Sequence, residues 1–149
     1  MKNLPPILFF ALSILAGLAI APAAQAADSV NIHATLILGS NQGGGVDGQL
    51  KRYERHLKRV FRFDTFQQKG GGASNVAIPG SGTVNVGGGH QISVNVTDAG
   101  NDKLRIAAKW TKSGRALINT TIVSSRNQPT VLGGPASGEG KLILLLVAN

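Results

Sequence analysis

The chain is apolar at every position from Leu142 to Ala148, and this run constrains the fold more than any other feature. A strand with one face in water alternates apolar and polar residues, whereas a strand buried on both faces does not. The segment Lys141–Ala148 is therefore predicted to be a central strand. A helix is expected to cover one of its faces, and a second layer of structure the other.

A single segment, Asp47–Phe63, has a clear helical period. On a helical wheel its apolar side chains form one stripe, and its cations occupy the opposite face. We expect Asp47 to be the N-cap and Glu54 to pair with Lys58 at (i, i+4) spacing. The stripe predicted to face the core consists of Leu50, Tyr53, Leu57, Val60 and Phe61.

Most of the remaining chain has the period of two that is typical of half-buried strands. Glycine-rich segments separate these runs and are predicted to be loops, and Ser113-Gly114 is predicted to be a tight hairpin turn. One strand, one helix and then several antiparallel strands predict an α+β fold: a mostly antiparallel twisted β-sheet with one amphipathic helix packed on one face. The predicted strands are 30–38, 64–69, 76–78, 83–86, 90–97, 103–112, 115–125 and 129–132, and the predicted glycine loops are 39–45, 69–75 and 133–140.

Residues 1–26 have the layout of a secretory signal peptide: a cationic Lys2, an apolar run over 7–21 and a small-residue site that ends at Ala26. Cleavage there would leave 27–149 as a single exported α+β domain, periplasmic or secreted. The alternative is an uncleaved membrane anchor, because the apolar run is nearly long enough to span a bilayer. The chain has no cysteine, so the exported domain must be stable without disulfides.

The formal net charge is +8, and the cations are concentrated on the predicted helix. A basic exported domain is expected to bind an anionic envelope component or an acidic protein, whereas nucleic acid is not expected outside the cell interior. The alternatives are a solvated face without a partner, and peripheral membrane contact with the apolar stripe inserted in lipid. The predicted partner-binding residues are Lys51, Arg52, Arg55, Lys58, Arg59 and Arg62.

Patterns typical of enzymes and metal sites are missing from the sequence. Nearly all carboxylates fall at turns or element ends, where capping and solvation account for them. His33, His56 and His90 are far apart, and none has a partner at metal-ligand spacing. The segment Gly134–Lys141 lacks the glycine spacing of a phosphate-binding loop. We therefore expect a non-enzymatic domain without a cofactor or a metal.

Two further hypotheses come from different functional classes. A small hydrolase or carbohydrate-active enzyme could assemble its site from loops, and it would bring acids or His33 and His90 together in one pocket. A structural protein could instead self-associate by adding strands to an exposed sheet edge, for which Val76–Val86 is the candidate.

The segment Pro129–Gly134, followed by Leu142–Val147, resembles the strand, Gly-Gly turn and closing strand near the end of bacterial secretin cores. This resemblance covers about the last twenty residues. Secretins are far longer and have a pore-forming module, so the resemblance implies no pore. The whole of 27–149 is similar to small uncharacterised exported domains of Gram-negative bacteria. That similarity implies an envelope location, and a role in an envelope or secretion assembly is expected.

Overall fold

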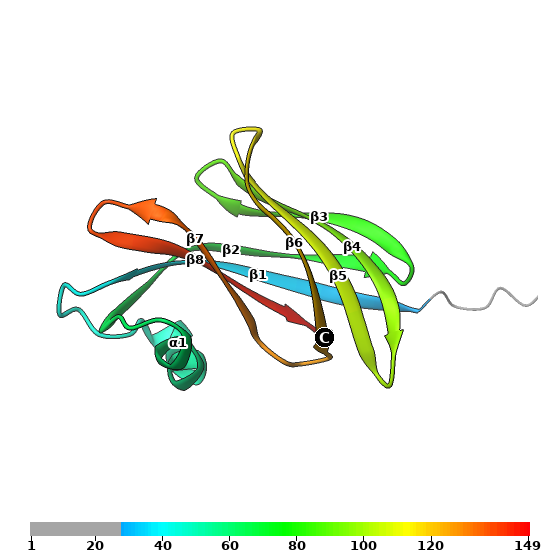
Figure 1. Cartoon of the computed structure of the whole chain (residues 1–149), viewed down its shortest axis with the longest axis horizontal. Coiled ribbons are helices and arrows are strands. Elements are labelled where there is room, and N and C mark those ends of the chain that lie inside the picture. Colours follow the sequence, from blue (N-terminus) through cyan, green and yellow to red (C-terminus); the bar gives the residue numbers. More distant parts are fainter. Residues whose placement is uncertain (1–27) are drawn as a thin grey trace, which may run out of the picture.

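The computed structural model describes residues 28–149, and the predicted signal peptide lies outside the described residues. Two four-stranded antiparallel sheets face each other, and one short helical segment lies on the outside (Figure 1). None of the helices in residues 28–149 is long and apolar enough to cross a membrane. The predicted β-rich α+β class is confirmed, and its strands form two sheets.

Sheet A and sheet B are the two layers of this sandwich. Sheet A has the order β2 (Thr65–Ala77), β1 (Ser29–Ser40), β8 (Gly140–Ala148), β7 (Thr130–Ser137). Sheet B has the order β3 (Gly80–Gly87), β4 (His90–Gly100), β5 (Lys103–Lys112), β6 (Arg115–Ser125). The helical segment comprises the 3₁₀ helix η1 (Gly48–Tyr53) and the α-helix α1 (Glu54–Val60).

Strand β8 has the two-sided burial that its unbroken apolar run predicts. Leu144 and Leu146 belong to the core between the sheets, whereas Ile143 and Leu145 belong to a second core under the helical segment. All four are at most 2 % exposed. The strand lies between β1 and β7, so it is an interior strand of sheet A. The prediction of a central strand with a helix on one side and a second layer on the other is confirmed.

The helical segment buries part of its predicted stripe. Leu50 and Leu57 are almost fully buried, and Tyr53 and Phe61 are half-buried against the same core. Val60 is 50 % exposed, so its predicted place in the stripe is wrong. The physical reason is that η1 has about three residues per turn, which shifts the phase of a wheel drawn for 3.6. The α-helix also ends at Val60, and Phe61 is already extended.

Asp47 lies at the predicted N-cap position, directly before η1, but its side chain makes no capping hydrogen bond. Its carboxylate instead accepts a hydrogen bond from the backbone N–H of Gln68 on β2 at 2.8 Å. The backbone carbonyl of Asp47 accepts from the N–H of Leu50 at 2.8 Å. Asp47 thus joins the start of η1 to sheet A. The predicted pair of Glu54 and Lys58 is present at 2.7 Å.

The glycine run 69–75 is part of strand β2, so the predicted loop is wrong. A Cβ at Gly70 would collide with the carbonyl oxygen of Val86, and one at Gly72 with that of Asn85. These glycines therefore allow the backbone of β3 to lie directly against β2. The loop predicted at 133–140 is likewise too long, because β7 continues to Ser137.

The hairpins of sheet B follow the prediction most closely. Strands β5 and β6 have the predicted bounds. The turn between them has positive φ at both Ser113 and Gly114, 49° and 82°, which is the signature of a type I′ turn. Such a turn matches the twist of the two strands, so the local sequence determines this pairing.

Candidate functional site

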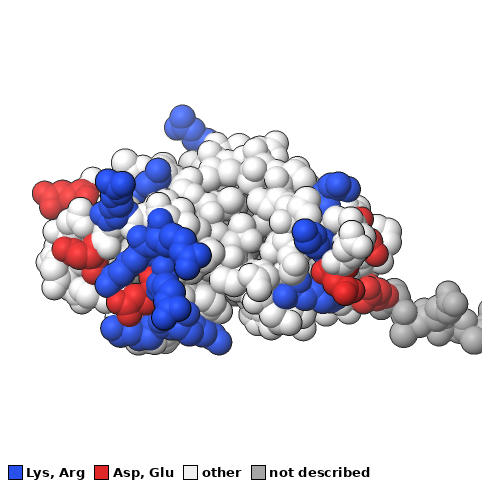
Figure 2. Space-filling view, turned by 60° about the horizontal axis from the view of Figure 1, so that its bottom comes forward, with Lys and Arg blue, Asp and Glu red and all other residues white. Residues whose placement is uncertain are grey.

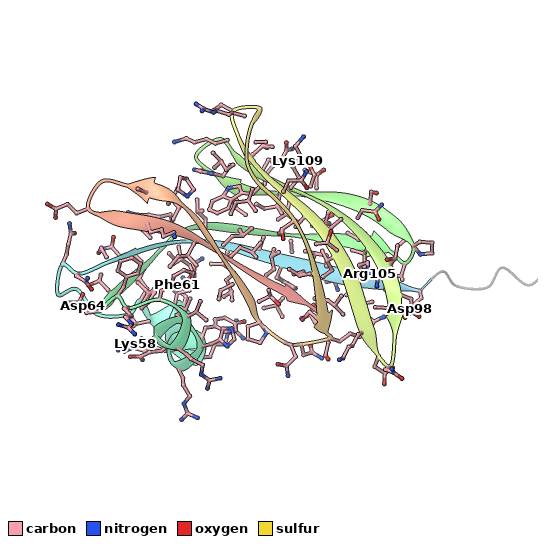
Figure 3. The ribbon with its side chains drawn as sticks, viewed as in Figure 1. Lys58, Phe61, Asp64, Asp98, Arg105 and Lys109 are labelled. Carbon is pink, nitrogen blue, oxygen red and sulfur yellow. The ribbon has the colours of Figure 1, made fainter. Side chains whose placement is uncertain are left out.

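The six predicted partner-binding residues lie together on the solvent side of the helical segment. We call them the basic patch, and each of the six is exposed. Figure 2 shows the dense group of Lys and Arg at the end of the molecule that carries α1. In Figure 3, Phe61 points toward sheet A while Lys58 points away from it. The basic patch comprises Lys51, Arg52, Arg55, Lys58, Arg59 and Arg62.

Two of the six cations are paired, and both share the same acid. Glu54 lies 2.7 Å from the Nζ of Lys58 and 3.6 Å from that of Lys51. The hydrogen bond from Lys58, helped by the charge of Lys51, holds the pKa of Glu54 below its ordinary value. Within residues 28–149, none of the four arginines of the basic patch forms an ion pair. Their charges are therefore available to an external anion.

The guanidinium of Arg52 lies over the ring of Tyr53, with 5.0 Å between its central carbon and the ring centroid. This cation–π contact restricts the Arg52 side chain to one side of η1. Tyr53 itself is half-buried against the helix core. The basic patch therefore has at least one cation with a defined position, supported by the same residues that close the core.

A groove of about 730 Å³ runs between η1 and the outer face of sheet A. The sheet forms its floor with His33 and Thr35 from β1, and Lys51 and Arg52 of the basic patch lie along its helical wall. None of the lining residues is acidic, and most can donate or accept a hydrogen bond. The other lining residues are Gly48, Gln49, Leu50, Tyr53, Gln68, Val147 and Asn149.

The sequence did not predict the groove, although the strand pattern indicates the orientation of two residues of its floor. In the segment 30–38 the alternation places His33 and Thr35 on the face opposite Ile32 and Ala34, so their outward orientation could be read directly. What could not be read is that η1 stops short of these residues and leaves that half of the face open. The hydrogen bond between Asp47 and Gln68 holds η1 in this position.

The histidines do not come together. His33 is exposed on the outer face of sheet A. His90 is only 6 % exposed in the interior between the sheets, where its Nδ1 accepts a hydrogen bond from the indole N–H of Trp110 at 3.0 Å. Sheet A separates the two, so they share no pocket. In residues 28–149, no group of three or more His, Asp or Glu side chains is placed to hold a metal ion.

Carboxylates in the described chain mostly serve local structure. Asp64 accepts from the N–H of Gly43 and the hydroxyl of Thr65. Asp98 accepts from the N–H of Gly100 within its own turn, and Asp28 pairs with Arg126 at 3.2 Å. These contacts are those expected of Asp residues at turns.

No family model matches the chain, and no curated protein or solved structure is significantly similar to it. The resemblance of the last strands to secretin cores therefore stays a prediction. The basic patch and the groove beside it are the features from which a function can be argued.

Proposed function

We propose that this protein is an exported, non-enzymatic binding domain that holds an anionic envelope polymer against the basic patch and the adjoining groove. The observation that carries the proposal is the set of four arginines that form no ion pair within residues 28–149. One of them, Arg52, lines a groove that has no acidic lining residue. Opposite charge attracts the polymer over a distance, and the groove adds short-range hydrogen bonds.

The support beneath the basic patch favours a binding role for it. Leu50 and Leu57 are 1 % and 0 % exposed, so the backbone that carries the cations is fixed to sheet A. A rigid array loses little conformational entropy when it binds, which raises the affinity for a multiply charged ligand. The same burial argues against a helix inserted in lipid, because these two side chains would have to leave the core.

The ligand class follows from the shape and chemistry of the site. An extended polymer can lie along the groove and contact the basic patch with successive charges. His33, Thr35 and Gln68 supply polar groups that suit sugar hydroxyls. The planar guanidinium of arginine can donate two parallel hydrogen bonds to the oxygens of a phosphate or carboxylate group. A glycan that bears carboxylate or phosphate groups satisfies all of these requirements, whereas a folded acidic protein would reach the cations without entering the groove.

The test compares two charge-reversed variants with equal changes in net charge. In the first, Arg52, Arg55 and Arg59 are each replaced by Glu. In the second, the control, Lys103, Arg105 and Lys109 on β5 are replaced by Glu; all three are exposed, and Figure 3 shows Arg105 and Lys109 on the other sheet from α1. Binding to polygalacturonate and to a phosphate-bearing wall polymer is measured by calorimetry at low and high salt, with dextran as the neutral glycan.

We expect the first variant to lose at least about tenfold in affinity while the control retains most of it, because only the first removes the local opposite charge. Binding of the native protein should weaken as salt is added, since exposed charges are screened. Equal losses in both variants, or unchanged binding in the first, would overturn the proposal. Binding to an acidic protein but to neither polymer would reject the polymer as the ligand.

A further inference from the structure

One edge of the sandwich is open to strand pairing. The strand order leaves four edge strands, β2 and β7 in sheet A and β3 and β6 in sheet B. The outer edge of an end strand presents alternate backbone N–H and C=O groups that can pair with another chain. Among residues 28–149, no backbone hydrogen bond joins 115–124 of β6 to any element other than β5.

The other three edges are protected. Strands β2 and β3 lie so close that a Cβ at Gly70 would collide with the backbone of β3. This contact covers both edges and removes Val76–Val86 as the candidate edge for strand addition. Strand β7 has a register shift between Gly133 and Ala136 and contains Pro135, two devices that interrupt pairing at edges.

Strand β6 has one register shift near its start, at Leu117, but its residues 118–125 pair regularly with β5. It is 11 residues long, and it has neither a charge nor a proline between Arg115 and Arg126. Val123 on its outer face is 54 % exposed, and Ile118 and Ile122 on its inner face are only partly buried against the main core. A long uncharged edge strand with exposed β-branched residues is a ready template for another strand.

We propose that two copies of this chain pair antiparallel through β6, in the register centred on Thr120, and form one continuous eight-stranded sheet. This register pairs residues 118–122 of the two copies, which belong to the regular part of β6 beyond its register shift. On the inner face, Ile118 then lies opposite Ile122 of the second copy. Because Trp110 is opposite Ile118 and Ile106 is opposite Ile122 within each copy, the row across the interface is apolar throughout.

The charges of sheet B also fit a second copy. Lys109 lies opposite Asn119, and Ala107 lies opposite Thr121. The register places Asn119 opposite Thr121 of the second copy. The row of side chains that starts at Lys109 of one copy therefore reaches Ala107, and not a second lysine, in the other copy. Like charges therefore do not face each other across the interface, which is the condition that two identical basic chains must meet. The basic patch lies on the outer face of sheet A, away from this edge.

The first experiment measures mass in solution by sedimentation velocity as the protein concentration is raised. The native protein is expected to reach twice the mass of one chain. Asn119→Lys combined with Thr121→Lys places like charges opposite each other and should give a monomer. The matched control is Thr83→Lys with Asn85→Lys, which adds the same charges to two exposed positions of the covered edge strand β3 and should stay dimeric.

The second experiment tests the register through a unique cysteine, since the chain contains none. Directly opposed residues of antiparallel strands are about 4.5–5.5 Å apart at Cα, which is within disulfide range. Thr120→Cys should therefore form a covalent dimer on mild oxidation, whereas Thr83→Cys should not. A native protein that stays monomeric, or a dimer that both lysine pairs leave intact, would overturn the proposal, and a dimer without the Thr120→Cys cross-link would overturn the register.

Discussion

Trp110 donates its indole N–H to Nδ1 of His90 at 3.0 Å in the interior of the sandwich. An indole nitrogen can only donate, so Nδ1 of His90 must be unprotonated and the ring proton must be on Nε2. Burial, helped by the charge of Lys112, lowers the pKa of His90. The neutral ring is thus built into the core between the sheets.

This contact predicts that stability falls in mild acid. The unfolded chain binds a proton to His90 near the ordinary pKa of 6.5, whereas the folded chain binds it only at lower pH. The contribution of neutral His90 to the free energy of unfolding is therefore fully present above about pH 6.5, and it decreases as the pH falls toward the lowered pKa. We expect the Tm to drop between about pH 7.5 and 5, and to drop less in His90→Gln, which keeps an acceptor for Trp110 but cannot titrate. Parallel melting curves would contradict this role.

A second prediction concerns the core under the helical segment. Leu57 is fully buried, so Leu57→Ala should lower the free energy of unfolding by about 2–5 kcal/mol. Val60 is 50 % exposed, and Val60→Ala should change it by no more than about 0.5 kcal/mol. Urea unfolding measures both variants. Equal losses would mean that Val60 is also packed against sheet A.

The close approach of β2 and β3 predicts that β2 requires glycine at position 70. Gly70→Ala places a methyl group against the carbonyl of Val86, and we expect a loss of about 1–3 kcal/mol. At the neighbouring Gly71, the nearest atom to an added Cβ is the carbonyl oxygen of Ala34 at 3.2 Å, so Gly71→Ala should cost less. Denaturant midpoints of the pair test this. A larger loss at Gly71 would reject the packing argument.

Glu54 is the single acid of the helical segment, and it restrains two cations of the basic patch. Glu54→Gln should tighten binding to the anionic polymer by about two- to fivefold at low salt, because it frees Lys51 and Lys58. The gain should vanish at high salt, where exposed charges are screened. Asp98→Asn, which removes one acid near the end of β4, is the control with the same change in net charge. Weaker binding of Glu54→Gln would show that the acid orients the lysines productively.

Local patterns determined a large part of this structure. Alternation predicted the strands of sheet B, since the period of two requires only that one face be buried. The unbroken run 142–148 predicted two-sided burial of β8, because no polar face was available to water. The division of the helical segment into apolar and cationic sides predicted both its packing and the exposure of the basic patch. Each of these conclusions depends on a residue and its near neighbours in sequence.

The tertiary structure decided what depends on contacts between distant segments. The glycines at 70–72 look like a loop in sequence, and only the backbone of β3 against them explains why they form a strand. The exposure of Val60 follows from a 3₁₀ turn that Asp47 fixes to Gln68. The groove exists because η1 covers only part of the outer face of sheet A. Strand β6 is an open edge because no backbone in residues 28–149 pairs with its outer side along 115–124. Periodicity is a local property and can be read along the chain, whereas the identity of the neighbouring backbone is set only when the two sheets meet.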